Sequence, residues 1–262
     1  MQLVDYISLC SGLFGWDLEK QALVSAQANN AIKYYNAPKQ LRFEELHTLE
    51  TRWYQSLANK EPDFSVYDTD LMLADVWACW RVYSQGYIKT LVSEKSLFTT
   101  SIVNDMGNMS SVVDLGCGAG CTTAALKEIF PNACVYGTNI EGTKQYRVAQ
   151  ENGHLFNFSV LPVASHVNEK GGLVFASEYF EHFYKPVDHL IEILDALSPN
   201  CLLVANSFSS RSVGHFDEYS CHNELYGNKE MGRVFNKELR SFGYDKVKTK
   251  CWNDRPSYWK KS

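Results

Sequence analysis

The segment with the clearest chemical character is Asp114-Leu115-Gly116-Cys117-Gly118-Ala119-Gly120. It places one acid two residues before the first of three glycines, each separated from the next by one residue. Glycines in such a turn let the backbone approach a ligand closely, because no Cβ atom intervenes. The carboxylate of Asp114 favours a positively charged group on that ligand. The segment therefore predicts a ligand-binding turn.

The spacing of the glycines separates two classes of ligand. Dinucleotide-binding turns read G-x-G-x-x-G and present helix amides to a pyrophosphate. Here the spacing is G-x-G-x-G, and Cys121 stands where the third glycine would be. Asp114 would repel a pyrophosphate, whereas it is favourable beside the amino group of S-adenosylmethionine (SAM). The sequence thus favours SAM over NAD, and an NAD-dependent oxidoreductase is the weaker alternative.

The elements around this turn predict how it is positioned. From about residue 110 to 206, short apolar runs alternate with amphipathic stretches. This alternation predicts a parallel sheet with helices on both faces, which binds ligands beyond the carboxyl ends of its strands. We expect strands at 111–115, 133–137, 156–161, 173–176 and 201–205, and helices at 122–130, 144–153 and 186–197.

Residues 110–206 resemble the class I SAM-dependent methyltransferases. The resemblance rests on the glycine turn and on two further stretches, 177–186 and 197–204. It implies an α/β fold with a doubly wound, mostly parallel sheet of the seven-stranded type. It also implies SAM as the cofactor, and a cofactor site that comprises Asp114, Gly116, Cys117, Gly118, Gly120, Asn139, Ile140 and Ser177.

Asn139 is a departure from the pattern of that family. The family carries an acid at the end of the second strand, which holds the ribose hydroxyls. The amide of Asn139 can still form hydrogen bonds, but without the charge-assisted strength of a carboxylate. Glu141 is a possible substitute, and Ile140 is expected either to pack against adenine or to belong to the core.

The residues after the fourth strand are the candidates for catalysis. SAM already activates its methyl group, so we expect no metal ion, only an aligned acceptor and a base where the acceptor carries a proton. Glu178 and His182 are four residues apart and would share one face of a helix beginning there. His182 is the first choice for the base because an ordinary histidine pKa suits pH 7. A structural role for His182 is the alternative, and Glu181 and His215 are weaker candidates.

The rest of the chain divides into two parts. Residues 1–97 predict a helical N-terminal subdomain or lid, with a helix near 43–57 and an aromatic stripe over 73–91 at helical spacing. That stripe either packs in the core or forms a wall over a substrate. Residues 98–262 predict the SAM-binding domain, with a substrate-loop insertion at about 207–232. We expect a helix at 233–242 and a strand at 246–252 after it.

The acceptor is less well defined than the cofactor. Nothing reads as the family's motifs for methylating DNA bases, so a small molecule is the leading acceptor. A nucleotide or nucleic acid is the alternative, because residues 233–262 carry a net charge of +6 while the rest carries −11. In that segment, lysines and Arg255 interleave with Trp252, Tyr258 and Trp259, which could stack on bases. A SAM-binding module without activity is a further alternative.

The remaining composition is that of an ordinary cytosolic protein. The eight cysteines are scattered without zinc-site spacing, which indicates free thiols in a reducing compartment. The first 16 residues lack the features of a signal peptide, and no apolar run approaches the roughly 18 residues of a membrane span. We therefore expect a cytoplasmic location and no membrane partner.

Overall fold

We analysed a computed structural model of the chain, which describes residues 17–19, 22, 26, 43–69, 72, 99–251 and 255–262. The aromatic stripe predicted over 73–91 and most of the predicted N-terminal subdomain lie outside these residues. In chain order the elements are α3 (Phe43–Ala58), η1 (Phe64–Asp68), α6 (Thr100–Gly107), β1 (Ser111–Leu115), α7 (Cys121–Ile129), β2 (Cys134–Thr138), α8 (Lys144–Phe156), β3 (Ser159–Leu161), η3 (Ala164–His166), β4 (Leu173–Ser177), η4 (Phe180–His182), α9 (Pro186–Leu197), β5 (Cys201–Ala205), β6 (Glu218–Cys221), β7 (Glu224–Gly227), α10 (Asn228–Ser241), β8 (Tyr244–Val247) and β9 (Ser257–Lys261).

Seven strands of the described part form one sheet in the order β3-β2-β1-β4-β5-β9-β8. Strands β1 to β5 pair in parallel, whereas β9 runs antiparallel to both β5 and β8. This arrangement confirms the predicted mostly parallel, seven-stranded sheet. The chain leaves β1 toward β2 and β3, then crosses back to β4 and β5, so the strand order reverses between β1 and β4. Ligands of open α/β sheets bind at such a reversal.

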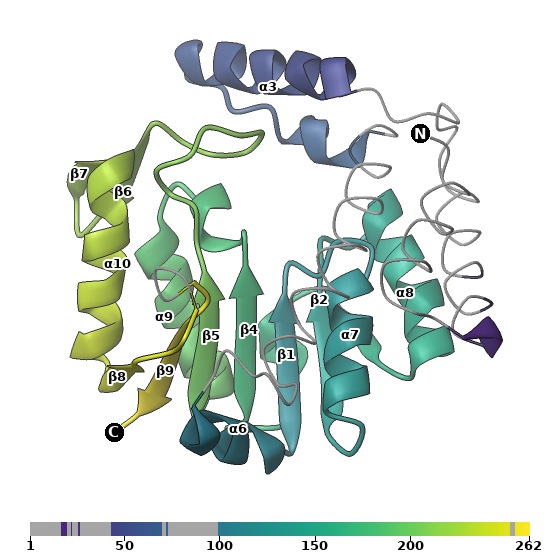
Figure 1. Cartoon of the computed structure of the whole chain (residues 1–262). Helices are drawn as coiled ribbons and strands as arrows, with labels where there is room; N and C mark the ends of the chain where they lie inside the picture. Colours follow the sequence, from purple (N-terminus) through teal and green to yellow (C-terminus); the bar gives the residue numbers. More distant parts are fainter. Residues whose placement is uncertain are drawn as a thin grey trace.

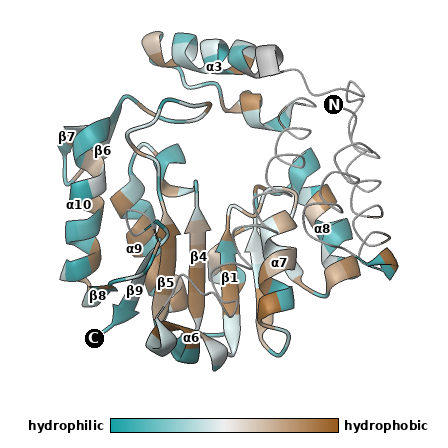
Figure 2. Ribbon diagram, in the orientation of Figure 1, coloured by the Kyte–Doolittle hydropathy of each residue, from teal (hydrophilic) through white to brown (hydrophobic). Residues whose placement is uncertain are grey.

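Apolar side chains on both faces of the sheet hold the fold together. Along β1, Val112 faces a core formed with α6 and α7, while Val113 and Leu115 face the core formed with α9 and α10. All five residues of β1, β4 and β5 are buried. Figure 2 shows β4 and β5 in brown, the colour of hydrophobic residues, along most of their length. Two-sided burial explains why their sequences are continuous apolar runs rather than alternating ones.

The C-terminal part of the chain differs from the sequence-based prediction. The predicted loop at 207–232 contains the β6–β7 hairpin, and α10 begins at Asn228 rather than at residue 233. The strand predicted at 246–252 is β8, which covers Tyr244–Val247. The final segment, predicted as a tail, contains β9, which lies between β5 and β8. Its residues alternate only briefly, so their place in the sheet follows from long-range pairing.

Helix α3 and η1 lie above the carboxyl ends of the central strands (Figure 1). The indole N–H of Trp53 in α3 donates to the backbone carbonyl of His215 over 2.6 Å. The backbone N–H of Lys144 donates to Asp68 at the end of η1. These contacts place part of the predicted N-terminal lid over the edge of the sheet where a ligand would bind. Among the described helices, none has the length and apolar character needed to cross a bilayer.

Candidate active site

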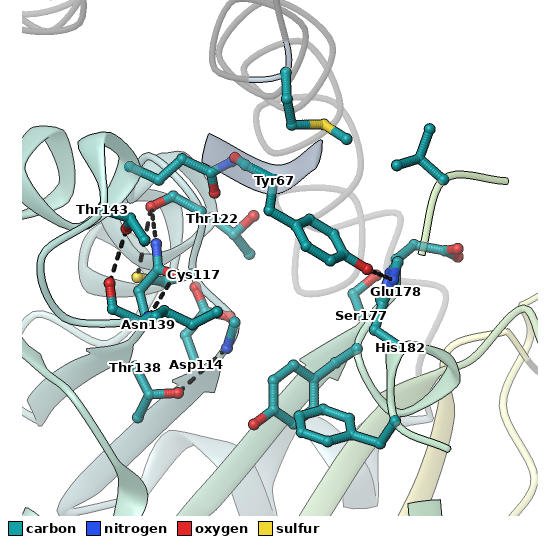
Figure 3. Close-up of a pocket in the computed structure, with 18 of the residues that line it drawn as sticks. Tyr67, Asp114, Cys117, Thr122, Thr138, Asn139, Thr143, Ser177, Glu178 and His182 are labelled. Atoms are coloured by element: carbon teal, nitrogen blue, oxygen red, sulfur yellow. Dashed lines mark hydrogen bonds between the residues drawn. The ribbon is translucent and has the colours of Figure 1, made fainter. Parts of the chain in front are cut away.

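A cavity of about 890 Å³ opens at the carboxyl ends of β1, β2 and β4. One wall, which holds the predicted cofactor residues and is called the cofactor wall below, consists of the turn after β1 and the residues that follow β2. The opposite wall, called the acceptor wall below, consists of the residues after β4 and of the loop around His215, and η1 contributes Phe64 and Tyr67. Figure 3 shows the two walls facing each other, with Asp114, Cys117 and Asn139 on one side and Glu178 and His182 on the other. The cavity thus joins the predicted cofactor residues to the predicted catalytic residues.

The turn after β1 needs its glycines. Gly116, Gly118 and Gly120 have φ angles of +67°, +55° and +79°, in the left-handed region that glycine adopts without strain. A Cβ atom on Gly116 would lie 2.5 Å from the ring of Tyr179. Gly116, Cys117 and Gly118 line the cavity, whereas Gly120 caps the N-terminus of α7 and is not among the lining residues. Gly120 therefore shapes the turn from behind the cavity wall.

Asp114 lies at the base of this turn and lines the cavity. Its side chain is buried and accepts a hydrogen bond from the hydroxyl of Thr123 over 2.6 Å. Burial raises the pKa of Asp114 to about 7, and the hydrogen bond from Thr123 partly offsets that increase. A buried carboxyl with a pKa near 7 would ionise readily beside a cationic ligand group.

Asn139 connects the two loops of the cofactor wall. Its amide N–H donates to the carbonyl of Gly118 over 2.7 Å, and its amide oxygen accepts from the backbone N–H of Ile140 over 2.8 Å. A carboxylate at this position could accept but could not donate to Gly118. The amide is therefore the side chain that this loop contact requires.

Ile140 and Ser177 also lie on the cavity surface. Ile140 is 63% exposed and lines the cavity, so it offers an apolar surface to a ligand. Ser177 is the last residue of β4, and its side chain is buried. Glu141, the predicted substitute for the ribose-binding acid, is exposed and is not among the lining residues.

Glu178 and His182 both line the cavity, but not on one helix face. Glu178 has a φ of +51°, and the helical turn begins only at Phe180 and is a short 3₁₀ turn. His182 shares a 2.7 Å hydrogen bond with the hydroxyl of Tyr67 (Figure 3). Burial, together with the nearby His215, lowers the pKa of His182 to about 3. The ordinary histidine pKa assumed from the sequence therefore does not apply, and His182 is neutral at pH 7.

The comparison with protein families identifies this part of the chain. The family model described as a methyltransferase domain matches residues 113–205, which run from β1 to the end of β5. These residues are therefore similar to a methyltransferase domain. No curated protein matches the chain at the threshold used.

Several solved structures resemble the chain at low identity. They include the magnesium protoporphyrin IX methyltransferase of Synechocystis PCC 6803 (18% identical, covering 83% of this chain and 96% of that chain, TM-score 0.45). The mitomycin 7-O-methyltransferase is 14% identical, with coverage of 94% and 76% and a TM-score of 0.45. A chain of the fibrillarin/Nop5p complex is 16% identical, with coverage of 54% and 65% and a TM-score of 0.39. This chain thus spans just under two thirds of the length of the fibrillarin/Nop5p chain. Likenesses this distant do not identify a substrate for this chain.

The cavity wall opposite the glycine turn contains contacts that the sequence did not predict. Tyr67 reaches His182 from η1, 115 positions earlier in the chain. Arg255, which the sequence indicated only as part of the basic C-terminal segment, lies two residues before β9 and contacts the carboxylate of Glu178 and the hydroxyl of Ser207. Both contacts depend on tertiary structure, and no local spacing in the sequence signals either.

Proposed function

We propose that the chain is a SAM-dependent methyltransferase that transfers a methyl group to an O, N or C nucleophile of a small molecule. The observation that supports this most directly is the single cavity shared by the glycine turn and by Glu178 and His182. The methyltransferase domain over residues 113–205 indicates the reaction class. The cavity volume is within the range of sites for small ligands.

The residues of the cofactor wall fit SAM. Asp114 would face the amino group of its methionine part, and Ser177 would lie beside the same part. Ile140 offers an apolar surface to the adenine, while Gly116 and Gly118 admit the ligand close to the backbone. When bound, SAM supplies an activated methyl group on a sulfonium centre.

The acceptor wall would position the nucleophile and receive its proton. Glu178 lines the cavity as a carboxylate held by Arg255 and Ser207. His182 is neutral at pH 7 and can accept a hydrogen bond, but its lowered pKa makes it a weak base. We therefore place proton acceptance first on Glu178, with His182 and Tyr67 fixing the geometry. The aromatic rings of Phe64, Tyr67, Tyr179, Phe183 and Tyr184 would bind a planar or apolar acceptor.

Burial of two aromatic residues weakens the nucleic-acid alternative, although the net charge of +6 over residues 233–262 is unchanged. Tyr258 and Trp259 are fully buried in β9, so they cannot stack on bases. Lys260 pairs with Asp105 over 2.8 Å, and Lys261 donates to the carbonyl of Phe242. Trp252 lies outside the described residues. These contacts give the aromatic residues of β9 a structural role and favour a small acceptor.

A transfer assay tests this proposal. The full chain would be incubated with methyl-labelled SAM and, separately, with a small-molecule extract, RNA or DNA, while release of S-adenosylhomocysteine is measured. We expect turnover with the small-molecule fraction and a large loss of turnover in Glu178→Gln. Label in RNA or DNA alone would support the nucleic-acid alternative. SAM binding without transfer to any fraction would support a binding module.

A further inference from the structure

Three side chains at the acceptor end of the cavity form a cluster with metal-ligand chemistry. Glu178, Glu181 and His215 each offer one ligand atom, and these atoms lie within 4.8 Å of one another. Glu181 is fully buried and His215 is 3% exposed. Glu178 and His215 line the cavity, and Glu181 lies behind them. The cluster joins a segment after β4 to a loop more than 30 residues later.

Glu181 supplies the first independent indication that the cluster binds a cation. One of its carboxylate oxygens accepts a hydrogen bond from the backbone N–H of Ser207. Among the residues that the structure describes, no donor reaches the other oxygen, Oε2, which is also buried. A buried carboxylate oxygen without a donor is costly. It calls for a positive group, or for a proton, at that position.

His215 is oriented as a ligand rather than as a donor. Its Nδ1 lies 2.8 Å from the carbonyl oxygen of Ser210. A carbonyl can only accept, so Nδ1 carries the proton and Nε2 keeps its lone pair. Metal-binding histidines are commonly fixed in this way by a backbone carbonyl at the other ring nitrogen.

In the described part of the chain, the cation that contacts this cluster is Arg255. Arg255 contacts Glu178 and Ser207, and its side chain is about half exposed. One guanidinium faces two carboxylates, and it is bound to Glu178 rather than to Glu181. His182, whose ring lies 4.8 Å from that of His215, already shares its Nδ1 with Tyr67.

We propose that Glu178, Glu181 and His215 form a binding site for one divalent cation. Two carboxylates and one imidazole are a donor set that suits Mn²⁺ or a similar ion with a preference for oxygen ligands. The ion would lie at the cavity wall because Glu178 and His215 line the cavity. If the proposed function holds, the ion would bind an acceptor oxygen there and lower its pKa, and Glu178 would then be a ligand of the ion rather than the proton acceptor. Binding of the ion itself does not depend on that function.

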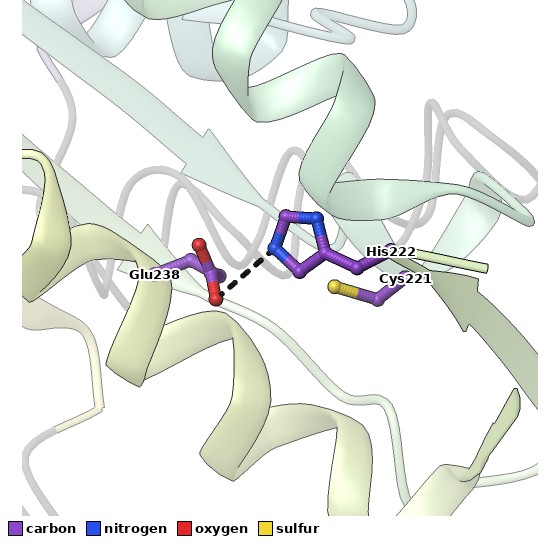
Figure 4. A group of neighbouring side chains, drawn as sticks. All are labelled: Cys221, His222 and Glu238. Atoms are coloured by element: carbon purple, nitrogen blue, oxygen red, sulfur yellow. Dashed lines mark ion pairs between the residues drawn. The ribbon is translucent and has the colours of Figure 1, made fainter. Parts of the chain in front are cut away.

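A second cluster, which lies outside the cavity, provides a matched control. Cys221, His222 and Glu238 also bring ligand atoms within 4.8 Å of one another (Figure 4). His222 already pairs with Glu238 over 3.3 Å. Burial raises the pKa of the Cys221 thiol to about 11, so this cluster lacks a ready thiolate.

Titration of the full chain with Mn²⁺ after treatment with a chelator tests the proposal. Free Mn²⁺ would be measured by electron paramagnetic resonance. We expect one bound ion per chain, with binding weakened more than about ten-fold in Glu181→Gln and in His215→Gln. Cys221→Ser and Glu238→Gln should bind Mn²⁺ as the wild type does. Arg255→Ala should bind it more tightly, because a competing cation is removed.

Two results would overturn the proposal. One is the absence of saturable Mn²⁺ binding up to about 1 mM, which would assign a proton or Arg255 alone to the cluster. The other is binding that survives both Glu181→Gln and His215→Gln. If circular dichroism shows that Glu181→Gln does not fold, Mn²⁺ binding by His215→Gln alone tests the proposal. SAM binding, measured without metal on the same samples, separates this question from the proposed function, because either ligand can bind while the other does not.

Discussion

At the scale of single residues, Asp114 should couple cofactor binding to pH. Its pKa is raised to about 7 by burial, and the amino group of SAM favours its ionised form. Below pH 7, SAM binding should therefore release a proton, and the affinity should fall about ten-fold for each pH unit. Calorimetry from pH 5.5 to 7.5, in buffers with different ionisation enthalpies, measures both effects.

Asp114→Asn is the matched control for this prediction. It keeps the size of the side chain and removes the titration, so the pH dependence should flatten. Without SAM, the carboxyl of Asp114 has its ordinary pKa of 3.8 in the unfolded chain and a pKa of about 7 in the folded protein. The stability that Asp114 contributes is thus complete below about pH 4 and is lost as the pH rises through 7. An unchanged slope in Asp114→Asn would assign the pH dependence to another group.

Asn139 leads to a prediction opposite to the one that the family pattern suggests. An acid at this position would restore the family's ribose-binding carboxylate, but it would lose the hydrogen bond to the carbonyl of Gly118. We expect Asn139→Asp to lower the free energy of unfolding by about 1 kcal/mol and to weaken SAM binding. Urea denaturation and calorimetry measure the two effects. Tighter SAM binding in Asn139→Asp would show that the loop contact is dispensable.

At the scale of elements, a hydrogen bond from Trp53 connects α3 to the loop that contains His215. Trp53 is fully buried, and its indole N–H donates to the carbonyl of His215. Trp53→Phe keeps an aromatic ring against Phe216 but removes the donor. We expect a loss of about 1–3 kcal/mol in unfolding free energy and faster hydrogen exchange across residues 207–217. Unchanged hydrogen exchange in this loop would show that the contact from α3 does not stabilise the loop that lines the cavity.

The elements that the sequence predicted are those with a strong local signal. Strands β1 and β5 and helix α9 appear at their predicted bounds, because buried apolar runs and a helix-starting proline are local features. Strand β9 was missed because it is specified by its neighbours β5 and β8. The glycine turn could be predicted as a ligand-binding segment because it is continuous in the sequence, whereas the opposite cavity wall assembles from η1, η4 and two distant loops.

At the scale of the whole molecule, β9 is a structural strand. Trp259 is fully buried, so Trp259→Ala should lower the free energy of unfolding by about 3–5 kcal/mol. The neighbouring Tyr258 is also buried, and its hydroxyl faces the thiol of Cys201, which is a weak hydrogen-bonding group, so Tyr258→Phe should cost less than about 1 kcal/mol. Urea denaturation distinguishes the two. A Trp259→Ala protein of wild-type stability but weaker RNA binding would restore the nucleic-acid alternative.

The proposed function depends on SAM binding at the glycine turn, and calorimetry tests that binding most directly. We predict that the wild-type chain binds one SAM and no NAD. Gly116→Val, whose new side chain would meet the ring of Tyr179, should remain folded by circular dichroism but bind SAM at least about ten-fold more weakly. Saturable NAD binding, or wild-type SAM affinity in a folded Gly116→Val protein, would contradict the account.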